Sequence, residues 1–464
     1  MPFHSPLLTP LLTPSLMPLH TPINRRRFLR NLGAALVSGA AVPTVIPASA
    51  LGRGGAVAPS GRIAIGVVGA AHGLANARRF LTLPDVAVTA VCDVDAHRLA
   101  SAVADVNERQ GGVVAKPWRD FREMFDKAGL DAVVLAAPDH WHGVMAIAAA
   151  RAGLDIWAET PLARTLAEGR AAVNAAANRG CVWQTGTWRR SVREYRLAAG
   201  FVQRGGLGLV THVEVGSGSL GETSAVRPED YGKPPAHLDY EMWVGPGLWT
   251  EYDARVVGGG WRGVSLYGGG TLADTAPHFI DIAQWALGMN HSGPVTIAGS
   301  IGREDASAEP FDVAPRYRCV CAYASGATLA VSAAFPRGVR FYGERGWLFV
   351  GDKIGMLPDG SIERPVLEAS DSDILAEVPP SAEVSSPFYR SDNHWRNFAD
   401  CVKSRRRTAS PAETGHRSAC IAHLGRIAAL TGRRIRWSPD AEEIKDDETA
   451  SQFLRPNFRM PWML

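Results

Sequence analysis

The chain contains 464 residues, of which 46% are hydrophobic and 20% charged, and its formal net charge is +3. This length is too great for one core and fits about two domains of ~150–200 residues. No apolar run beyond residue 50 reaches the ~18 residues of a spanning helix, which argues against an integral membrane protein. The first 50 residues carry four arginines and no acid, so the remainder has a formal charge of −1, with no basic surplus to favour nucleic acid.

The amino terminus resembles a twin-arginine export signal. The run Asn24-Arg25-Arg26-Arg27-Phe28-Leu29-Arg30 precedes a weakly apolar stretch that ends Ala48-Ser49-Ala50, a pattern that signal peptidase accepts. We expect residues 1–50 to be a signal peptide and residues 51–61 a linker. The mature protein would then be periplasmic or otherwise extracytoplasmic, exported folded and often with its cofactor already loaded. The alternative is a disordered basic leader.

A strand, a glycine turn, a helix, a second strand and an acid open the first predicted domain, residues 62–185. Ile63–Val68 reads as a buried strand, and the turn that follows contains Gly69, Ala71, His72 and Gly73. A helix to about Leu83, a strand over Val86–Val91 and Asp93 complete the unit. Glycines let the backbone approach a pyrophosphate, and the acid accepts hydrogen bonds from ribose hydroxyls. The turn departs from the full fingerprint because Ala71 stands where glycine is usual.

Strands and helices continue to alternate through the rest of this domain. Helices are expected over 96–109, 142–152 and 166–179, an amphipathic segment over 118–128, and strands over 131–136, 154–158 and 182–185. This alternation predicts a doubly wound parallel sheet. Ligands of such sheets bind at the carboxyl ends of the strands, where Pro138, Asp139, His142, Glu159 and Pro161 fall.

No metal site is predicted. His140 and His142 are two residues apart, but a metal would need a third ligand such as Glu159 or His278, so packing roles are preferred for the two rings. The six cysteines form no metal-ligand pattern and are expected to be free thiols. They are Cys92, Cys181, Cys319, Cys321, Cys401 and Cys420.

Several stretches resemble the glucose–fructose oxidoreductase/inositol dehydrogenase (Gfo/Idh/MocA) family. They are Ala137–His142, Glu159–Ala163, Gln184–Thr187, Gly268–His278, His394–Lys403, Gly415–Ser418 and Trp437, in this order along the chain. The family's Glu-Lys-Pro signature reads Glu159-Thr160-Pro161 here, so threonine replaces lysine. An ammonium can shuttle a proton, whereas a threonine hydroxyl cannot act as a base at neutral pH.

The resemblance implies a second α+β domain with a large, mostly antiparallel open sheet, placed at residues 186–435 and followed by a polar tail at 436–464. The residue pattern agrees, because strand-like segments occur over 209–216, 295–301, 317–323, 327–333 and 347–351, and residues 397–429 have helical spacing. An open sheet face of this size also implies a homo-oligomer.

The predicted catalytic group is Asp274, His278 and Thr160. Asp274 and His278 are four apart on a predicted helix over 274–287, so the carboxylate would fix the imidazole tautomer and raise its pKa. A helix-capping Asp and a buried His are the alternative. The resemblance assigns proton transfer to these positions. Substrate contacts are expected from Trp188, Arg189, Trp261 and Arg262, through stacking and guanidinium hydrogen bonds.

These observations predict an exported oxidoreductase that transfers hydride between NAD or NADP, held tightly, and a sugar or sugar derivative. Asp93 favours NAD, because a carboxylate repels a 2′-phosphate. One alternative is a glycoside-cleaving relative that works by transient oxidation and elimination. Another is a cofactor-free lyase or a sugar-binding pseudoenzyme, which the altered glycine turn and Thr160 both favour.

Overall fold

The computed structural model describes residues 57–218, 231–302, 310–353, 363–378 and 389–463. These residues belong to one compact unit, Val57–Leu464. The predicted signal peptide lies outside the described residues, as does the linker up to residue 56. Among the described residues, no helix is long and apolar enough to cross a membrane.

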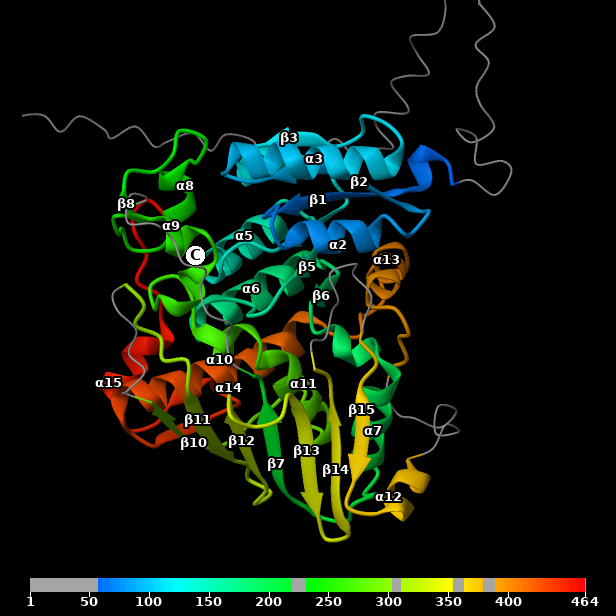
Figure 1. The fold of residues 1–464 in the computed structure, drawn as a ribbon, viewed down its shortest axis with the longest axis vertical. Coiled ribbons are helices and arrows are strands. Elements are labelled where there is room, and N and C mark those ends of the chain that lie inside the picture. Colours follow the sequence, from blue (N-terminus) through cyan, green and yellow to red (C-terminus); the bar gives the residue numbers. More distant parts are fainter. Residues whose placement is uncertain (1–56, 219–230, 303–309, 354–362, 379–388, 464) are drawn as a thin grey trace, which may run out of the picture. The chain divides into compact units, whose positions relative to one another are not determined.

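The first domain is built on a six-stranded parallel sheet with strand order β3-β2-β1-β4-β5-β6 (Figure 1). The strands are β1 Ile63–Val68, β2 Val86–Cys92, β3 Lys116–Trp118, β4 Ala132–Leu135, β5 Asp155–Ala158 and β6 Trp183–Thr185. The helices between them are α2 Gly73–Phe80, α3 Ala96–Gln110, α4 Phe121–Lys127, α5 Asp139–Arg151 and α6 Leu166–Arg179. This is the strand order of dinucleotide-binding folds, and it confirms the predicted doubly wound sheet.

Both faces of this sheet are covered, which explains why its central strands read as continuous apolar runs. Every residue of β4 and β5 is buried. Trp157 of β5 packs edge-on against Phe80 of α2 and stacks on Trp395, with ring centroids 5.2 Å and 5.5 Å away. Trp395 belongs to α13 (His394–Ser404), so a helix from the predicted second domain completes the core of the first.

The second domain is a nine-stranded sheet with order β15-β14-β13-β7-β12-β11-β10-β16-β17. Its strands are β7 Val210–Gly216, β10 Thr296–Ile301, β11 Tyr317–Ala322, β12 Thr328–Ser332, β13 Gly338–Gly343, β14 Gly346–Gly351, β15 Val366–Ala369, β16 Ile435–Ser438 and β17 Glu443–Ile444. Only β7 and β12 pair in parallel; the other pairs are antiparallel, as expected.

Three helices cover one face of this sheet: α7 Arg193–Gln203, α11 Pro277–Ala286 and α14 Ala412–Thr431 (Figure 1). Along β11 the side chains alternate, with Tyr317, Cys319 and Cys321 buried toward the helices and Arg318 and Val320 exposed. The six cysteines are all free thiols, as predicted. The smaller elements are β8 Tyr231–Gly232, α8 Tyr240–Val244, β9 Tyr252–Asp253, α9 Ala254–Val257, α10 Gly270–Asp274, α12 Ser372–Glu377 and α15 Glu448–Ser451, with 3₁₀ turns at Pro59–Gly61, Trp188–Ser191, Gly260–Gly263 and Gln452–Leu454.

Two predicted helices are wrong because each is interrupted. The helix expected over 274–287 is split between α10, which ends at Asp274, and α11, which begins at Pro277. Proline has no N–H to continue the ladder and is tolerated at a first helical position. The segment expected as helical over 397–429 is likewise divided between α13 and α14, with Arg405 in the left-handed region and Pro411 before α14.

The predicted polar tail at 436–464 is also wrong for its described part. Strands β16 and β17 extend the nine-stranded sheet, and Trp437 is buried in its core. Farther on, Trp462 packs edge-on against Trp141 of α5 with ring centroids 4.8 Å apart, under the guanidinium of Arg122. These aromatic contacts attach the carboxyl-terminal segment to the first domain, which composition alone did not indicate.

Candidate active site

A cavity of about 670 Å³ lies at the carboxyl ends of β1, β2, β4 and β5, with the second domain forming its other wall. This volume is in the usual range for small-molecule sites, ~300–1,000 Å³. Of the predicted site residues, all but Gly73 and Pro161 line it. The lining set is Gly69, Ala71, His72, Asp93, Pro138, Asp139, His142, Glu159, Thr160, Trp188, Arg189, Trp261, Arg262, Asp274 and His278.

The glycine turn keeps the two glycines that its geometry requires. Gly69 has φ +89°, and a Cβ there would lie 2.5 Å from the Ala136 carbonyl oxygen. At Gly73, which opens α2, a Cβ would lie 2.7 Å from Val67 Cγ1, so this glycine permits close helix–strand packing. Ala71 is exposed toward the cavity. The first turn of α2 has no side-chain cap. Its Gly73 and Ala75 N–H groups are given to the carbonyls of Gly69 and His72, so an anion would meet the amides of Ala71 and His72. The turn fits a pyrophosphate, with one added methyl group at Ala71.

Asp93 holds the end of β2 against the glycine turn. Its Oδ2 accepts the Ala70 N–H at 2.8 Å and its Oδ1 accepts the Asp95 N–H at 2.9 Å. Burial raises the pKa of this carboxyl group. Each carboxylate oxygen has a further lone pair, and the residue lines the cavity together with Arg98 and Arg119. The sequence did not single out these two arginines.

Glu159 is fixed where β5 ends. Its Oε1 accepts hydrogen bonds from Asn76 Nδ2 at 2.8 Å and from Trp157 Nε1 at 2.9 Å. Gly186, after β6, packs directly on this carboxylate. The side-chain oxygen of Asn76 accepts a hydrogen bond from the Trp395 indole N–H at 3.0 Å. Glu159 therefore connects α2, β5 and α13 at the cavity wall.

The two predicted packing histidines contact backbone carbonyls. His142 Nδ1 lies 2.5 Å from the Pro161 oxygen and Nε2 lies 2.7 Å from the Ala137 oxygen. His140 Nε2 lies 3.0 Å from the Trp243 oxygen. Burial lowers the pKa of both rings, that of His140 to about 3. The His142 ring thus joins the loops after β4 and β5, and this contact places Pro161 behind the cavity wall.

The predicted pairing of Asp274 with His278 is wrong. Because the helix breaks between them, Asp274 Oδ2 instead accepts a hydrogen bond from Arg262 Nε at 3.1 Å. His278 Nε2 lies 3.3 Å from Thr160 Oγ1, and Thr160 Oγ1 donates to the Asp274 carbonyl oxygen at 2.8 Å. The expected rise in the pKa of His278 is also wrong. Burial lowers it well below its ordinary value, and the nearby charges of Arg189 and Arg337 lower it further.

A buried charge cluster lies behind His278. Arg189 donates from Nε and Nη2 to the two oxygens of Asp352 at 2.8 Å and 3.0 Å, and its guanidinium lies over the rings of Trp188 and Phe279. Arg337 Nε donates to the same carboxylate at 3.0 Å. Arg189 thus lines the cavity while it is engaged with Asp352. Asp352 was not predicted as a partner, since it lies 163 residues from Arg189 along the chain.

Asp139 is a buried acid at the first turn of α5. It is 2% exposed and accepts the Gly269 N–H. Burial and the Asp274 charge raise the pKa of Asp139 well above its ordinary value. The cavity therefore contains a buried acid with a raised pKa and a second carboxyl group, that of Asp274, which is paired with Arg262.

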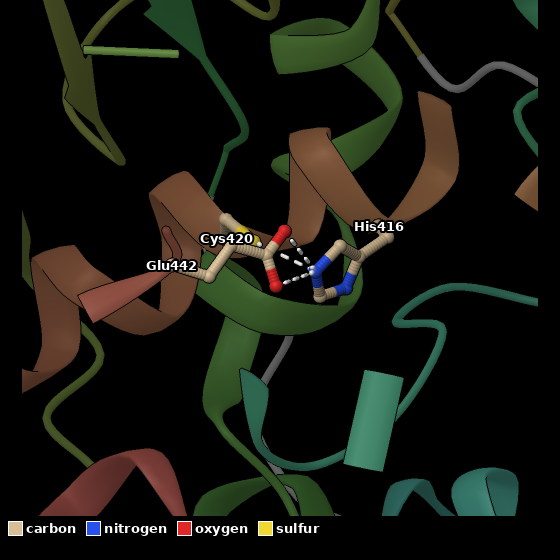
Figure 2. A group of neighbouring side chains, drawn as sticks. All are labelled: His416, Cys420 and Glu442. Carbon is tan, nitrogen blue, oxygen red and sulfur yellow. Dashed lines mark hydrogen bonds and ion pairs between the residues drawn. The ribbon is translucent and has the colours of Figure 1, made fainter. Parts of the chain in front are cut away.

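A second cluster, His416, Cys420 and Glu442, has the composition of a metal site (Figure 2). His416 Nε2 lies 3.0 Å and 3.1 Å from the Glu442 oxygens and 3.4 Å from Cys420 Sγ. However, Glu442 also pairs with Arg170 and Arg417. These guanidiniums already supply the positive charge that an ion would bring, so we assign the cluster to packing of α14 against α6.

Family models match most of the described chain. Residues 63–187 match the model described as "Oxidoreductase family, NAD-binding Rossmann fold", and residues 225–339 and 370–464 match "Oxidoreductase family, C-terminal alpha/beta domain".

Curated relatives are similar over shorter lengths. A glycosyl hydrolase family 109 protein of Saccharopolyspora erythraea is 32% identical over 161 residues, which is 32% of this chain and 35% of that protein. Levoglucosan dehydrogenase of Pseudarthrobacter phenanthrenivorans is 25% identical over 289 residues, 59% of this chain and 66% of that enzyme. The chain thus spans about one third to two thirds of the length of these relatives.

Solved structures share the fold. The WlbA dehydrogenase from Bordetella pertussis, in complex with NADH and UDP-GlcNAcA, has a TM-score of 0.58 at 17% identity and covers 81% of this chain and 99% of its own. Levoglucosan dehydrogenase, in complex with NADH and levoglucosan, has a TM-score of 0.54 at 19% identity, over 80% of this chain and 98% of its own. Together with the two matched domains and the cavity between them, these findings show that the chain belongs to the Gfo/Idh/MocA oxidoreductase family.

Proposed function

We propose that the protein is an NAD-dependent oxidoreductase that acts on a sugar or sugar derivative. The observation that carries this proposal is the cavity itself, which runs from the glycine turn and Asp93 to Thr160 and His278. A dinucleotide needs an anion-binding turn at one end and a place beside proton-transfer groups at the other, and this cavity offers both. Relatives that act on sugars or bind NADH with a sugar ligand support the substrate class.

The residues around the turn fit the dinucleotide. The amides of Ala71 and His72 would face the pyrophosphate, since the Ala70 N–H is given to Asp93 and the Gly73 N–H to the Gly69 carbonyl. The remaining lone pairs of Asp93 would accept from ribose hydroxyls, which favours NAD over NADP. Glu159 and Pro138 would border the nicotinamide at the ends of β5 and β4. When bound, a nicotinamide supplies the hydride acceptor that no protein side chain provides.

Side chains other than Thr160 would transfer the proton, because the Thr160 hydroxyl already donates its hydrogen to the Asp274 carbonyl oxygen. His278, Asp274 and Asp139 line the cavity. Trp188 and Trp261 offer ring faces for stacking on a sugar, and Arg262 lies over Trp261 at 4.2 Å from the ring centroid. Arg262 and Asp274 therefore form one polar edge of the substrate side.

Glycoside cleavage through transient oxidation is the second candidate function. Asp139 favours it, because burial raises the pKa of this carboxyl group, and an acid with a raised pKa beside the cavity can give its proton to a leaving oxygen. The similarity to glycosyl hydrolase family 109 proteins supports it as well. This reaction ends without net redox change, since the electrons removed in the first step return in the last.

Releasing bound nucleotide from the purified protein tests the proposal. Denaturation should free NAD(H), identified by absorbance near 340 nm after reduction and by mass. Incubation with sugars and glycosides then separates the two reactions, because a dehydrogenase forms NADH stoichiometrically and a glycoside-cleaving enzyme forms free sugar without it. If the protein releases no nucleotide and has no measurable affinity for NAD, both candidate functions are overturned. The cofactor-free lyase or the sugar-binding pseudoenzyme would then remain.

We further propose twin-arginine export to the periplasm and assembly of a homo-oligomer through the open face of the nine-stranded sheet. Replacement of Arg26 and Arg27 by lysine should leave the protein in the cytoplasmic fraction. Light scattering of the purified protein measures the assembly. A monomer with an unchanged cavity would remove the oligomer from the proposal without affecting the reaction.

A further inference from the structure

The hydroxyl of Thr160 makes two contacts, and their chemistry fixes their direction. Thr160 is 7% exposed. Its Oγ1 lies 2.8 Å from the Asp274 carbonyl oxygen, which can only accept, and 3.3 Å from His278 Nε2. A threonine hydroxyl carries one hydrogen. Since this hydrogen is given to the closer carbonyl, Thr160 Oγ1 is left to accept from His278.

The imidazole therefore has its own proton on Nε2. Burial and the charges of Arg189 and Arg337 lower the pKa of His278, opposed by Asp352, and His72 acts in the same direction as the arginines. This lowered pKa favours the neutral ring, which carries one N–H. Its Nδ1 is buried and has no hydrogen-bond partner among the described residues. A proton on Nε2 finds an acceptor in Thr160, whereas a proton on Nδ1 finds none.

We propose that Thr160 is a positioning residue that fixes His278 in the Nε2–H tautomer, with this N–H given to Thr160 Oγ1. Because Nε2 then carries the proton and Nδ1 is buried, the ring offers no accessible basic nitrogen to the cavity. His278 is therefore not the group that removes a proton from a substrate hydroxyl. The carboxylate of Asp274, which lines the same cavity, is left to accept that proton.

The role of His278 in the reaction rests on the proposed function, but its tautomer can be measured without enzyme turnover. Selective ¹⁵N labelling of histidine and long-range ¹H–¹⁵N correlation report the tautomer of each neutral ring. The His278 resonance among the thirteen histidines is assigned by its loss in His278→Gln. The wild-type protein should show Nε2–H.

Thr160 variants test the cause. Thr160→Val removes the acceptor and should shift the tautomer ratio of His278 toward Nδ1–H by roughly 2- to 10-fold, the equivalent of one net hydrogen bond. Thr160→Ser should restore the wild-type ratio. Thr408→Val is the matched control, since Thr408 is also buried and donates to a backbone carbonyl, that of Trp183, away from His278.

Two results would overturn the proposal: an Nδ1–H or protonated His278 in the wild type, or an unchanged ratio in a folded Thr160→Val. If Thr160→Val does not fold, the wild-type and Thr160→Ser spectra still decide. The nucleotide-release experiment is separate from this test. A protein that binds no NAD but shows the Nε2–H tautomer of His278 would refute the proposed function and leave the tautomer proposal standing.

Discussion

Adding one methyl group at Gly186 tests whether the position of Glu159 matters. A Cβ at residue 186 would lie 2.4 Å from Glu159 Oε2 and 2.8 Å from its Cδ. Ordinary contacts are near 3.5 Å, so the carboxylate of a Gly186→Ala variant must withdraw by about 1 Å. The same carboxylate accepts from Asn76 and Trp157 through Oε1. The movement should therefore break or lengthen at least one of these bonds.

The cost follows from the charge on the acceptor. A hydrogen bond to a charged group contributes ~1.5–3 kcal/mol, so the free energy of unfolding in urea should fall by about that amount. Asn76 and Glu159 both line the cavity. A displaced pair should weaken NADH binding about tenfold, the equivalent of ~1.4 kcal/mol, in a fluorescence titration.

Gly112→Ala is the matched control, because a Cβ there has no atom within 4 Å. It should change the stability by less than ~0.5 kcal/mol and leave NADH binding unaltered. If Gly186→Ala has the wild-type free energy of unfolding and the wild-type affinity for NADH, the Glu159 carboxylate moves without cost. Its contacts with α2 and β5 would then have no part in shaping the site.

Four further variants test other parts of the structure. Ala71→Gly removes a methyl group from the pyrophosphate turn and should tighten NADH binding by roughly 2- to 5-fold, about the effect of one methyl contact, measured by titration. Thr160→Lys should raise sugar-dependent NADH formation by ~10²–10⁴ if an acid–base group is what the site lacks; bound NADH without any gain counts against this. Asp281→Asn should lower the free energy of unfolding by ~3–5 kcal/mol, because it leaves the buried Arg190 without the carboxylate that holds it at 2.5 Å and 2.8 Å. Burial raises the pKa of Glu168 to about 7 from 4.5, so between these two pH values the folded protein keeps a proton that the unfolded chain has lost. The free energy of unfolding in urea, compared with that of Glu168→Gln, should therefore fall by roughly 3 kcal/mol as the pH rises from 4.5 to 7. A difference that does not change with pH would refute this prediction.

The first domain was predictable because its signals are local. An apolar run bounded by glycine predicted both ends of β1 correctly, and the alternation of strands and helices predicted the parallel sheet. The helix errors have a local cause too. Pro277 and Pro411 stand at the two breaks, and the helical spacing of apolar residues does not reveal them because proline interrupts a helix whatever the spacing.

The second domain depended on long-range pairing. The sequence indicated several of its strands, but their order brings β7 beside both β12 and β13, and carries β16 and β17 from the chain end to the sheet edge. Register of this kind is set by packing of one sheet face on α7, α11 and α14. Composition made the final segment look like a polar tail because only alternate residues of its strands are buried.

Most of the predicted residues line the cavity, whereas their hydrogen-bond partners were not predicted. The carboxyl ends of parallel strands lie at the same edge of a sheet, so the residues that follow β1, β2, β4 and β5 were expected to lie close together. Which side chain pairs with which depends on loop geometry: Asp274 meets Arg262, and His278 meets Thr160, 118 residues away. Asp139 was predicted as a cofactor contact, and only its burial beside Asp274 in the structure shows that the pKa of its carboxyl group is raised.

Thr160 shows why a missing catalytic group is an incomplete description. From the sequence, the change from lysine removes an ammonium and leaves a weaker group. In the structure, the hydroxyl donates to a carbonyl 114 residues away, and in the proposed tautomer it accepts from His278. A lysine ammonium at this position has three donors and no acceptor, so a contact with Nε2 would require the opposite tautomer of the same ring. The substitution therefore reverses the hydrogen-bonding role of His278 toward residue 160, and the ring no longer offers Nε2 as a base.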